Sequence, residues 1–126
     1  SIIEETAQAV KKDGDKIVGL LSSESTSKFK IYQKALNNSN IKVLSVTNQQ
    51  QKLLNEVILH VMSGAQGSTD KECLKTVISD LCKRGAKSII LGCTELPLAI
   101  SQDDVTVKLF DSTEIIAKSA LQHTFK

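Results

Sequence analysis

Short apolar runs rich in β-branched residues recur along the chain and alternate with longer segments in which apolar residues have helical spacing. Each short run is flanked by polar or turn-forming residues, which is typical of strands buried inside a sheet. We therefore expect four strands, at Lys16–Leu21, Ile41–Val46, Lys87–Leu91 and Val105–Phe110.

The segments around these runs carry apolar residues three or four positions apart, which predicts helices. The chain opens directly in such a pattern, and another lies near its C-terminus. Gly85 is expected to end one helix at the C′ position, and Gly64–Thr69 is expected to be a flexible connection between two helices. The five apolar sets are Ile2, Ile3, Thr6 and Val10; Phe29, Tyr32 and Leu36; Leu53, Leu54, Val57, Ile58 and Val61; Leu74, Val77, Ile78 and Leu81; and Ile115, Ile116, Ala120 and Leu121.

Strands that alternate with helices predict an α/β fold, with a parallel sheet of about four strands flanked by helices on both faces. A length of 126 residues suits one domain, so we expect residues 1–126 to form a single α/β domain. The chain begins at Ser1 inside a helical pattern, from which we expect it to be part of a longer protein. In such sheets, function lies beyond the carboxyl ends of the strands.

Composition and charge narrow the classes of function. Hydrophobic residues make up 40% of the chain and charged residues 24%, which is the balance of a globular protein. The 16 basic and 14 acidic residues are scattered, and aromatic residues are few, so nucleic-acid binding is unsupported. No apolar stretch approaches the roughly 20 residues of a membrane span. Three cysteines without a C-x-x-C pair argue against disulfides and a metal site, and favour a cytoplasmic location.

The first strand runs into Ser22-Ser23-Glu24-Ser25-Thr26, a cluster of hydroxyl groups. Hydroxyls and free backbone N–H groups at the start of a helix can bind a carboxylate or a phosphate. Serine and threonine are also the preferred residues for capping a helix. From the residues alone, both interpretations of Ser22, Ser23 and Thr26 stay open.

The third strand runs into Gly92-Cys93-Thr94-Glu95-Leu96-Pro97. Gly92 allows a tight turn, and Pro97 suits the first turn of a helix. Cys93 would then lie at a helix N-terminus, where the pKa of a thiol is lowered toward neutrality and the thiol can exchange protons near pH 7. The alternative is that Cys93 is a small buried hydrophobic residue.

The remaining candidates are expected to be structural. Asp111 is expected to cap the last helix. Cys73 and Cys82 have the spacing of residues on the core side of one helix. His60 and His123 are not spaced for metal ligation and are expected to be structural or solvated, and Asp103-Asp104 is expected to form a turn.

The run Gly92-Cys93-Thr94-Glu95, preceded by Gly85–Leu91, resembles the second cysteine motif of the aspartate/glutamate racemase superfamily. Glutamate racemases typically carry His after Cys-Thr, whereas this chain has Glu95 there, which resembles the motif of the aspartate racemase branch. The likeness extends over essentially the whole chain. It includes Val18–Ser23, Thr26, Tyr32-Gln33 and Leu36 near the start, and Gln102–Asp104, Leu109–Asp111 and Ile115–Ala117 near the end.

The resemblance implies a flavodoxin-like half, the C-terminal one of two similar halves that each give one cysteine to a shared cleft. One thiolate removes the α-proton of an amino acid and the other cysteine protonates the opposite face, with no cofactor. Cys93 would be one of the two catalytic cysteines. Thr94, Glu95 and the loop residues Ser22, Ser23 and Thr26 would bind the substrate. The partner would be the missing N-terminal half, without which the chain is expected to be inactive. Self-association into a homodimer is also expected.

The chain departs from the family pattern at Ser23 and Ser25, where Thr and often Gly are usual, and at Met62-Ser63-Gly64, where a Lys commonly precedes the Gly. Two alternatives to an acidic amino-acid racemase therefore remain. One is a related isomerase or decarboxylase, such as a hydantoin racemase, a maleate isomerase or an arylmalonate decarboxylase. The other is a non-catalytic domain that binds a small anion or a partner.

Overall fold

The computed structural model describes the backbone of residues 1–124 and the side chains of residues 1–122. These residues form four strands in one sheet, and every neighbouring pair of strands is parallel. The spatial order is β2-β1-β3-β4, which confirms the expected parallel α/β sheet. The strands are β1 (Ile17–Leu21), β2 (Lys42–Ser45), β3 (Ser88–Leu91) and β4 (Lys108–Asp111).

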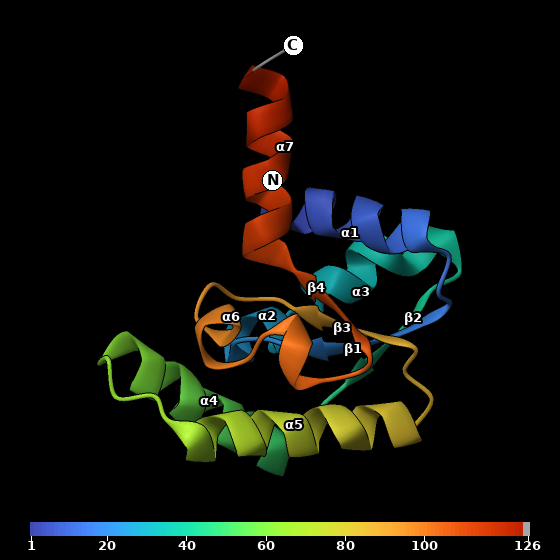
Figure 1. The fold of residues 1–126 in the computed structure, drawn as a ribbon. Helices are drawn as coiled ribbons and strands as arrows, with labels where there is room; N and C mark the ends of the chain where they lie inside the picture. Colours follow the sequence, from blue (N-terminus) through green and yellow to red (C-terminus); the bar gives the residue numbers. More distant parts are fainter. Residues whose placement is uncertain (125–126) are drawn as a thin grey trace.

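Helices cover both faces of this sheet (Figure 1). One face carries α1 (Ile2–Asp13), α3 (Ile31–Leu36) and α7 (Ser112–Thr124), and the other carries α4 (Asn48–Met62) and α5 (Ser68–Lys83). Two short helices follow the central strands at their carboxyl ends. They are α2 (Glu24–Lys28) after β1 and α6 (Leu96–Ala99) after β3, and two 3₁₀ turns lie at Asn37–Ser39 and Gln102–Asp104.

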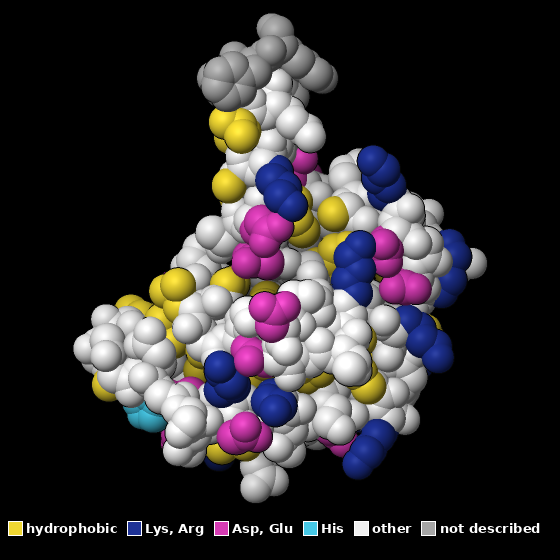
Figure 2. Space-filling view, in the orientation of Figure 1, with side chains coloured by type: hydrophobic (Ala, Val, Ile, Leu, Met, Phe, Trp, Pro, Cys, Tyr) yellow, Lys and Arg dark blue, Asp and Glu magenta, His cyan; other side chains and the backbone are white. Residues whose placement is uncertain are grey.

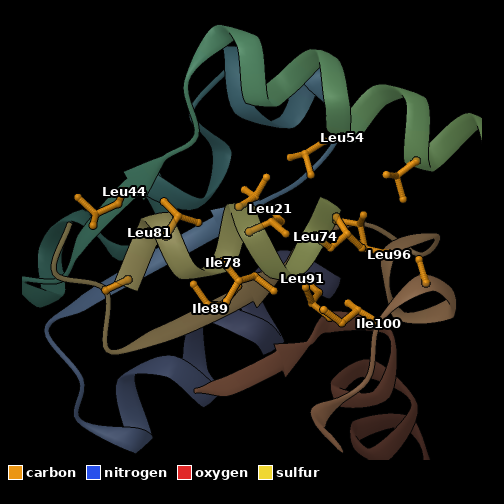
Figure 3. Close-up of a cluster of buried hydrophobic side chains, with 14 of the residues drawn as sticks. Leu21, Leu44, Leu54, Leu74, Ile78, Leu81, Ile89, Leu91, Leu96 and Ile100 are labelled. Carbon is orange, nitrogen blue, oxygen red and sulfur yellow. The ribbon is translucent and has the colours of Figure 1, made fainter. Parts of the chain in front are cut away.

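Each face of the sheet contributes to a separate apolar core. Alternate residues of a strand point to opposite faces, so Ile89 and Leu91 pack under α4 and α5, whereas Ile90 packs under α1 and α3. Figure 3 shows the core on the α4–α5 side, where Leu54, Leu74 and Leu81 approach the sheet. Because the central strands are buried on both faces, their sequences are continuous apolar runs.

Helix α5 approaches β1 closely, and Gly19 makes this approach possible. A side chain at residue 19 would place its Cβ 2.8 Å from Ile89 Cδ1, 3.0 Å from Leu81 Cδ1 and 3.3 Å from Leu81 Cβ. The first atom is the far end of a flexible side chain, but Leu81 Cβ is tied to the backbone of α5. A glycine in the middle of β1 therefore sets the spacing between the sheet and α5.

Two expected boundaries are wrong. The helix expected to contain Phe29, Tyr32 and Leu36 is broken, because Lys30 has a left-handed backbone with φ of 53°. Phe29 is the C-cap that follows α2. Phe29 is 60% exposed, whereas Tyr32 and Leu36 are buried. The fourth strand starts at Lys108 instead of Val105. Val105 still belongs to the preceding 3₁₀ turn, where its N–H donates to the Gln102 carbonyl at 3.3 Å, and pairing with β3 begins only at Lys108, opposite Ser88.

Most of the other structural expectations are confirmed. Gly85 follows α5 with φ of 114°, as a C′ glycine does. Cys73 and Cys82 lie on α5, partly buried against the core. The α7 helix forms as expected, but Leu121 on it is exposed rather than buried. His60 is structural, because its Nδ1 lies 2.8 Å from Asp70 Oδ1 and so links α4 to the start of α5. Its side chain is half exposed.

The close approach at Gly19 yields a test of the packing. We expect Gly19→Ala to lower the free energy of unfolding by about 1–3 kcal/mol, because the added Cβ overpacks the contact with Leu81 and Ile89. Gly67→Ala is the matched control: it has no atom within 4 Å of its Cβ position and no left-handed φ, so it adds the same methyl group without overpacking. Gly67 is the N-cap of α5, so a small capping loss is expected, but the total effect should be smaller than that of Gly19→Ala. Urea unfolding measures both, and equal effects would contradict the packing argument.

Candidate functional site

The carboxyl ends of β1 and β3 meet at the point where the sheet topology reverses. The chain passes from β1 to β2 on one side and later returns to place β3 on the other side of β1. Leu21 pairs with Leu91, and the Gly92 N–H donates to the Leu21 carbonyl at 2.7 Å. The Ser22–Thr26 loop and the Gly92–Glu95 turn therefore leave the sheet side by side, where ligands bind in open α/β sheets.

The turn that carries Cys93 is shaped by Gly92. A Cβ at residue 92 would lie 3.1 Å from Leu20 Cδ1, 3.1 Å from Tyr32 Cε2 and 3.3 Å from the Leu21 carbonyl oxygen. These distances are shorter than ordinary van der Waals contact, so a side chain at residue 92 would push against its neighbours on three sides, and glycine avoids this. The chain then enters α6 with Pro97 in its first turn, as expected.

Cys93 is a partly buried, free thiol that packs against the α4–α5 core. Burial raises its pKa, and backbone N–H groups of Leu96 and Glu95 lower it by a smaller amount, while the charge of Glu95 raises it further. The expected depression of the pKa toward neutrality is therefore wrong for this chain. The helix that follows has only four residues, and its weak positive end does not offset the loss of water around the thiol.

Thr94 and Glu95 interact with each other next to the thiol. The Thr94 hydroxyl donates a hydrogen bond to the Glu95 carboxylate, and Thr94 itself is exposed. Glu95 also starts α6, although its side chain does not cap the helix. The turn therefore holds a carboxylate and a thiol close together, and the thiol remains protonated at neutral pH because its pKa is raised.

The serine loop after β1 is held mainly by its own hydrogen bonds. Ser23 caps α2: its Oγ accepts from the Thr26 N–H at 3.5 Å and donates to Thr26 Oγ1 at 3.1 Å. Ser22 is buried and donates to the Ser23 carbonyl at 3.1 Å. Gln51 of α4 donates from Nε2 to the Ser22 carbonyl at 3.0 Å, which fixes the loop to the helix behind it.

Sequence reasoning missed two buried hydroxyl groups beneath the Cys93 turn. Ser112 is completely buried, and its Oγ donates to the Leu91 carbonyl at 2.7 Å, directly before Gly92. Tyr32 is also completely buried and presents its ring to Gly92. The only sequence signal was Asp111-Ser112-Thr113 at a strand end, which pointed correctly to Asp111 as the cap: its Oδ1 accepts from the N–H groups of Thr113 at 3.0 Å and Glu114 at 3.1 Å.

The other candidates lie away from this edge. Asp103 and Asp104 form part of a 3₁₀ turn, as expected for a turn before β4. The side chain of His123 lies outside the described residues. Within the described part of the chain, no three His, Cys, Asp or Glu side chains come together as metal ligands. In the same residues, no helix has the length and apolar character needed to cross a membrane.

The charge next to the thiol gives a testable pH dependence. The Glu95 carboxylate raises the pKa of Cys93, so Glu95→Gln should lower that pKa. At a fixed pH below the thiol pKa, more Cys93 is then thiolate, and its alkylation by iodoacetamide should be faster. Mass spectrometry of the Cys93 peptide follows this one thiol. Glu114→Gln, which removes an exposed carboxylate paired with Lys118, is the control and should leave the rate unchanged. Slower alkylation in Glu95→Gln would contradict the assignment.

Comparisons with known proteins agree with this geometry. The family model described as Asp/Glu/hydantoin racemase matches residues 1–120. An uncharacterised protein of Pectobacterium carotovorum subsp. carotovorum, encoded in the pnlA 3′ region, is 35% identical over 127 residues, which cover 99% of this chain and 84% of that protein.

Two solved structures are similar over almost the entire chain. A candidate Asp/Glu racemase from Yersinia pestis superposes with a TM-score of 0.89 at 28% identity, covering 99% of this chain and 55% of that one. An aspartate racemase homologue from Pyrococcus horikoshii OT3 has a TM-score of 0.86 at 31% identity, covering 100% of this chain and 56% of that one. The chain thus spans about half the length of these solved relatives, and it belongs to the Asp/Glu/hydantoin racemase family.

Proposed function

We propose that this chain supplies Cys93 as one of the two acid/base residues of a cofactor-independent amino-acid racemase. The observation that carries the proposal is the position of this thiol. It stands on a tight turn at the β1/β3 switch point, in a chain that belongs to a racemase family. The single thiol accounts for one face of the substrate, and a second half would supply the other residue.

The raised pKa of Cys93 suits the role of proton donor. In this chain the thiol keeps its proton at neutral pH. A base on the opposite side of the substrate would take the α-proton and break that C–H bond. Cys93 would then give its S–H proton to the opposite face of the same carbon and become a thiolate. The reverse reaction exchanges the two roles, so no oxidant, reductant or cofactor is needed.

We propose an acidic amino acid, aspartate above all, as the substrate. The similarity to an aspartate racemase homologue and the Gly-Cys-Thr-Glu sequence support this choice. The Thr94 hydroxyl and neighbouring N–H groups would bind the substrate carboxylate, which requires Thr94 to turn away from Glu95. The Glu95 carboxylate suits the substrate ammonium group, and Ser22, Ser23 and Thr26 would line the same cleft.

The partner in this proposal is an N-terminal half that closes the cleft. The solved relatives are about twice as long as this chain. Leu59, Met62 and Leu98 are large and exposed on α4 and α6, and Figure 2 shows hydrophobic side chains on the flank that carries these helices. Burying them against the other half, or against a second copy in a homodimer, would remove apolar surface from water. The free cysteines suit the reducing cytoplasm as the location.

Exchange of the α-proton with deuterated water tests the reaction directly. We expect aspartate to exchange when this chain is joined to its N-terminal half, and we expect no exchange by the 126-residue chain alone. Cys93→Ser in the joined protein should reduce conversion of one aspartate enantiomer into the other by about a hundredfold or more, because a serine hydroxyl is a far weaker acid than a thiol. Proton NMR measures the loss of the α-proton signal, and chiral chromatography measures the opposite enantiomer.

Cys82→Ser is the matched control, because Cys82 lies on α5 and should leave the rate unchanged. Exchange by the isolated chain would overturn the need for a second half. Turnover of hydantoins or maleate, without exchange of any amino acid, would select the related enzymes of the family. A joined, folded protein that is inactive on every one of these substrates would leave a non-catalytic binding domain as the function.

A further inference from the structure

Three completely buried hydroxyl groups meet on the α1–α3 side of the sheet, close to the turn that carries Cys93. They belong to Thr6 of α1, Tyr32 of α3 and Ser112 at the start of α7, and we call them the hydroxyl cluster. The three elements are far apart in sequence and converge only through packing on one face of the sheet (Figure 1).

Two members of the hydroxyl cluster donate hydrogen bonds to backbone carbonyl groups. Thr6 Oγ1 donates to the Ile2 carbonyl at 2.7 Å, and Ser112 Oγ donates to the Leu91 carbonyl at 2.7 Å. Each oxygen still has lone pairs that can accept a hydrogen bond. The Tyr32 hydroxyl is buried without a partner within bonding distance, and the neighbouring hydroxyls of Thr6 and Ser112 lower its pKa by less than burial raises it. Tyr32 therefore keeps its proton and has two acceptors close by.

The ring of Tyr32 lies directly against the turn. Its Cε2 atom, next to the hydroxyl-bearing carbon, is 3.1 Å from where a Cβ of Gly92 would stand. The Ser112 bond ends on the Leu91 carbonyl, the last one before Gly92. The Ser112 hydrogen bond and the Tyr32 ring thus both lie against the peptide from which the Cys93 turn begins.

We propose that Tyr32 and Ser112 are positioning residues for Cys93, holding the end of β3 so that the sulfur meets the backbone N–H groups of Glu95 and Leu96. Ser112 acts through its hydrogen bond to the Leu91 carbonyl. Tyr32 acts through its ring, which lies against Gly92, because its hydroxyl has no bonded partner. The inference rests on the proposed acid/base role of Cys93, but its test does not need turnover.

The test is the pH profile of Cys93 alkylation in the 126-residue chain, followed on the Cys93 peptide by mass spectrometry. Ser112→Ala removes the bond to the Leu91 carbonyl, and Tyr32→Leu removes the ring beside Gly92. Each should slow alkylation by about threefold or more at a fixed pH below the thiol pKa, because the thiolate is then held less well. Tyr32→Phe keeps the ring and removes only a hydroxyl without a bonded partner, so its profile should coincide with that of the parent.

Ser88→Ala is the matched control. Ser88 is also completely buried with an unpartnered hydroxyl, but it lies at the opposite end of β3. Its alkylation profile should coincide with that of the parent. If Ser112→Ala and Tyr32→Leu leave the profile unchanged, or Ser88→Ala slows alkylation equally, the positioning role is overturned. Should Ser112→Ala fail to fold, Tyr32→Leu still decides. Absence of α-proton exchange in the joined protein would overturn the proposed function, and the alkylation profiles would still decide the positioning role.

Discussion

The Gly92 N–H donates a 2.7 Å hydrogen bond to the Leu21 carbonyl, and the candidate site exists because this bond joins the ends of β1 and β3. It extends a parallel register in which Leu21 already faces Leu91. The bond requires the backbone of residue 92 to pass between Leu20, Tyr32 and the Leu21 carbonyl, where a glycine avoids the tight contacts that a Cβ would make. Gly19, earlier in β1, also lies where a Cβ would make tight contacts, there with Leu81 of α5 and Ile89 of β3.

Two opposing effects decide the protonation of Cys93. Hydrogen bonds from backbone N–H groups favour the thiolate, whereas burial and the nearby Glu95 charge favour the thiol. Burial is the larger effect, since α6 is a single turn with little dipole to offer. In a two-sided proton transfer this outcome is useful: one residue must start protonated while its counterpart starts as the base. The local environment thus suits Cys93 to the donor role.

The fold was predictable because the chain follows the period of its elements closely. The runs Ile17–Leu21 and Ser88–Leu91 are apolar at nearly every position, and buried parallel strands require that pattern. The helix predicted around Phe29 was wrong, because hydrophobic spacing does not report backbone conformation. Lys30 adopts a left-handed φ, which separates Phe29 from the helix that contains Tyr32. The strand prediction was also wrong at Val105, because this residue ends a 3₁₀ turn and pairing with β3 starts only at Lys108.

The sequence by itself determined the sheet and the two turns at its carboxyl edge, and its resemblance to the racemase superfamily made Cys93 the candidate acid/base residue. The sheet and the turns follow from local periodicity and from residue types, such as Gly92 and Pro97, whose backbone properties do not depend on distant contacts. Only the tertiary structure decided the raised pKa of Cys93 and the meeting of Thr6, Tyr32 and Ser112. Thr6 and Ser112 are more than a hundred positions apart, and the core that buries Cys93 gathers residues from several elements, so no local pattern could reveal either feature.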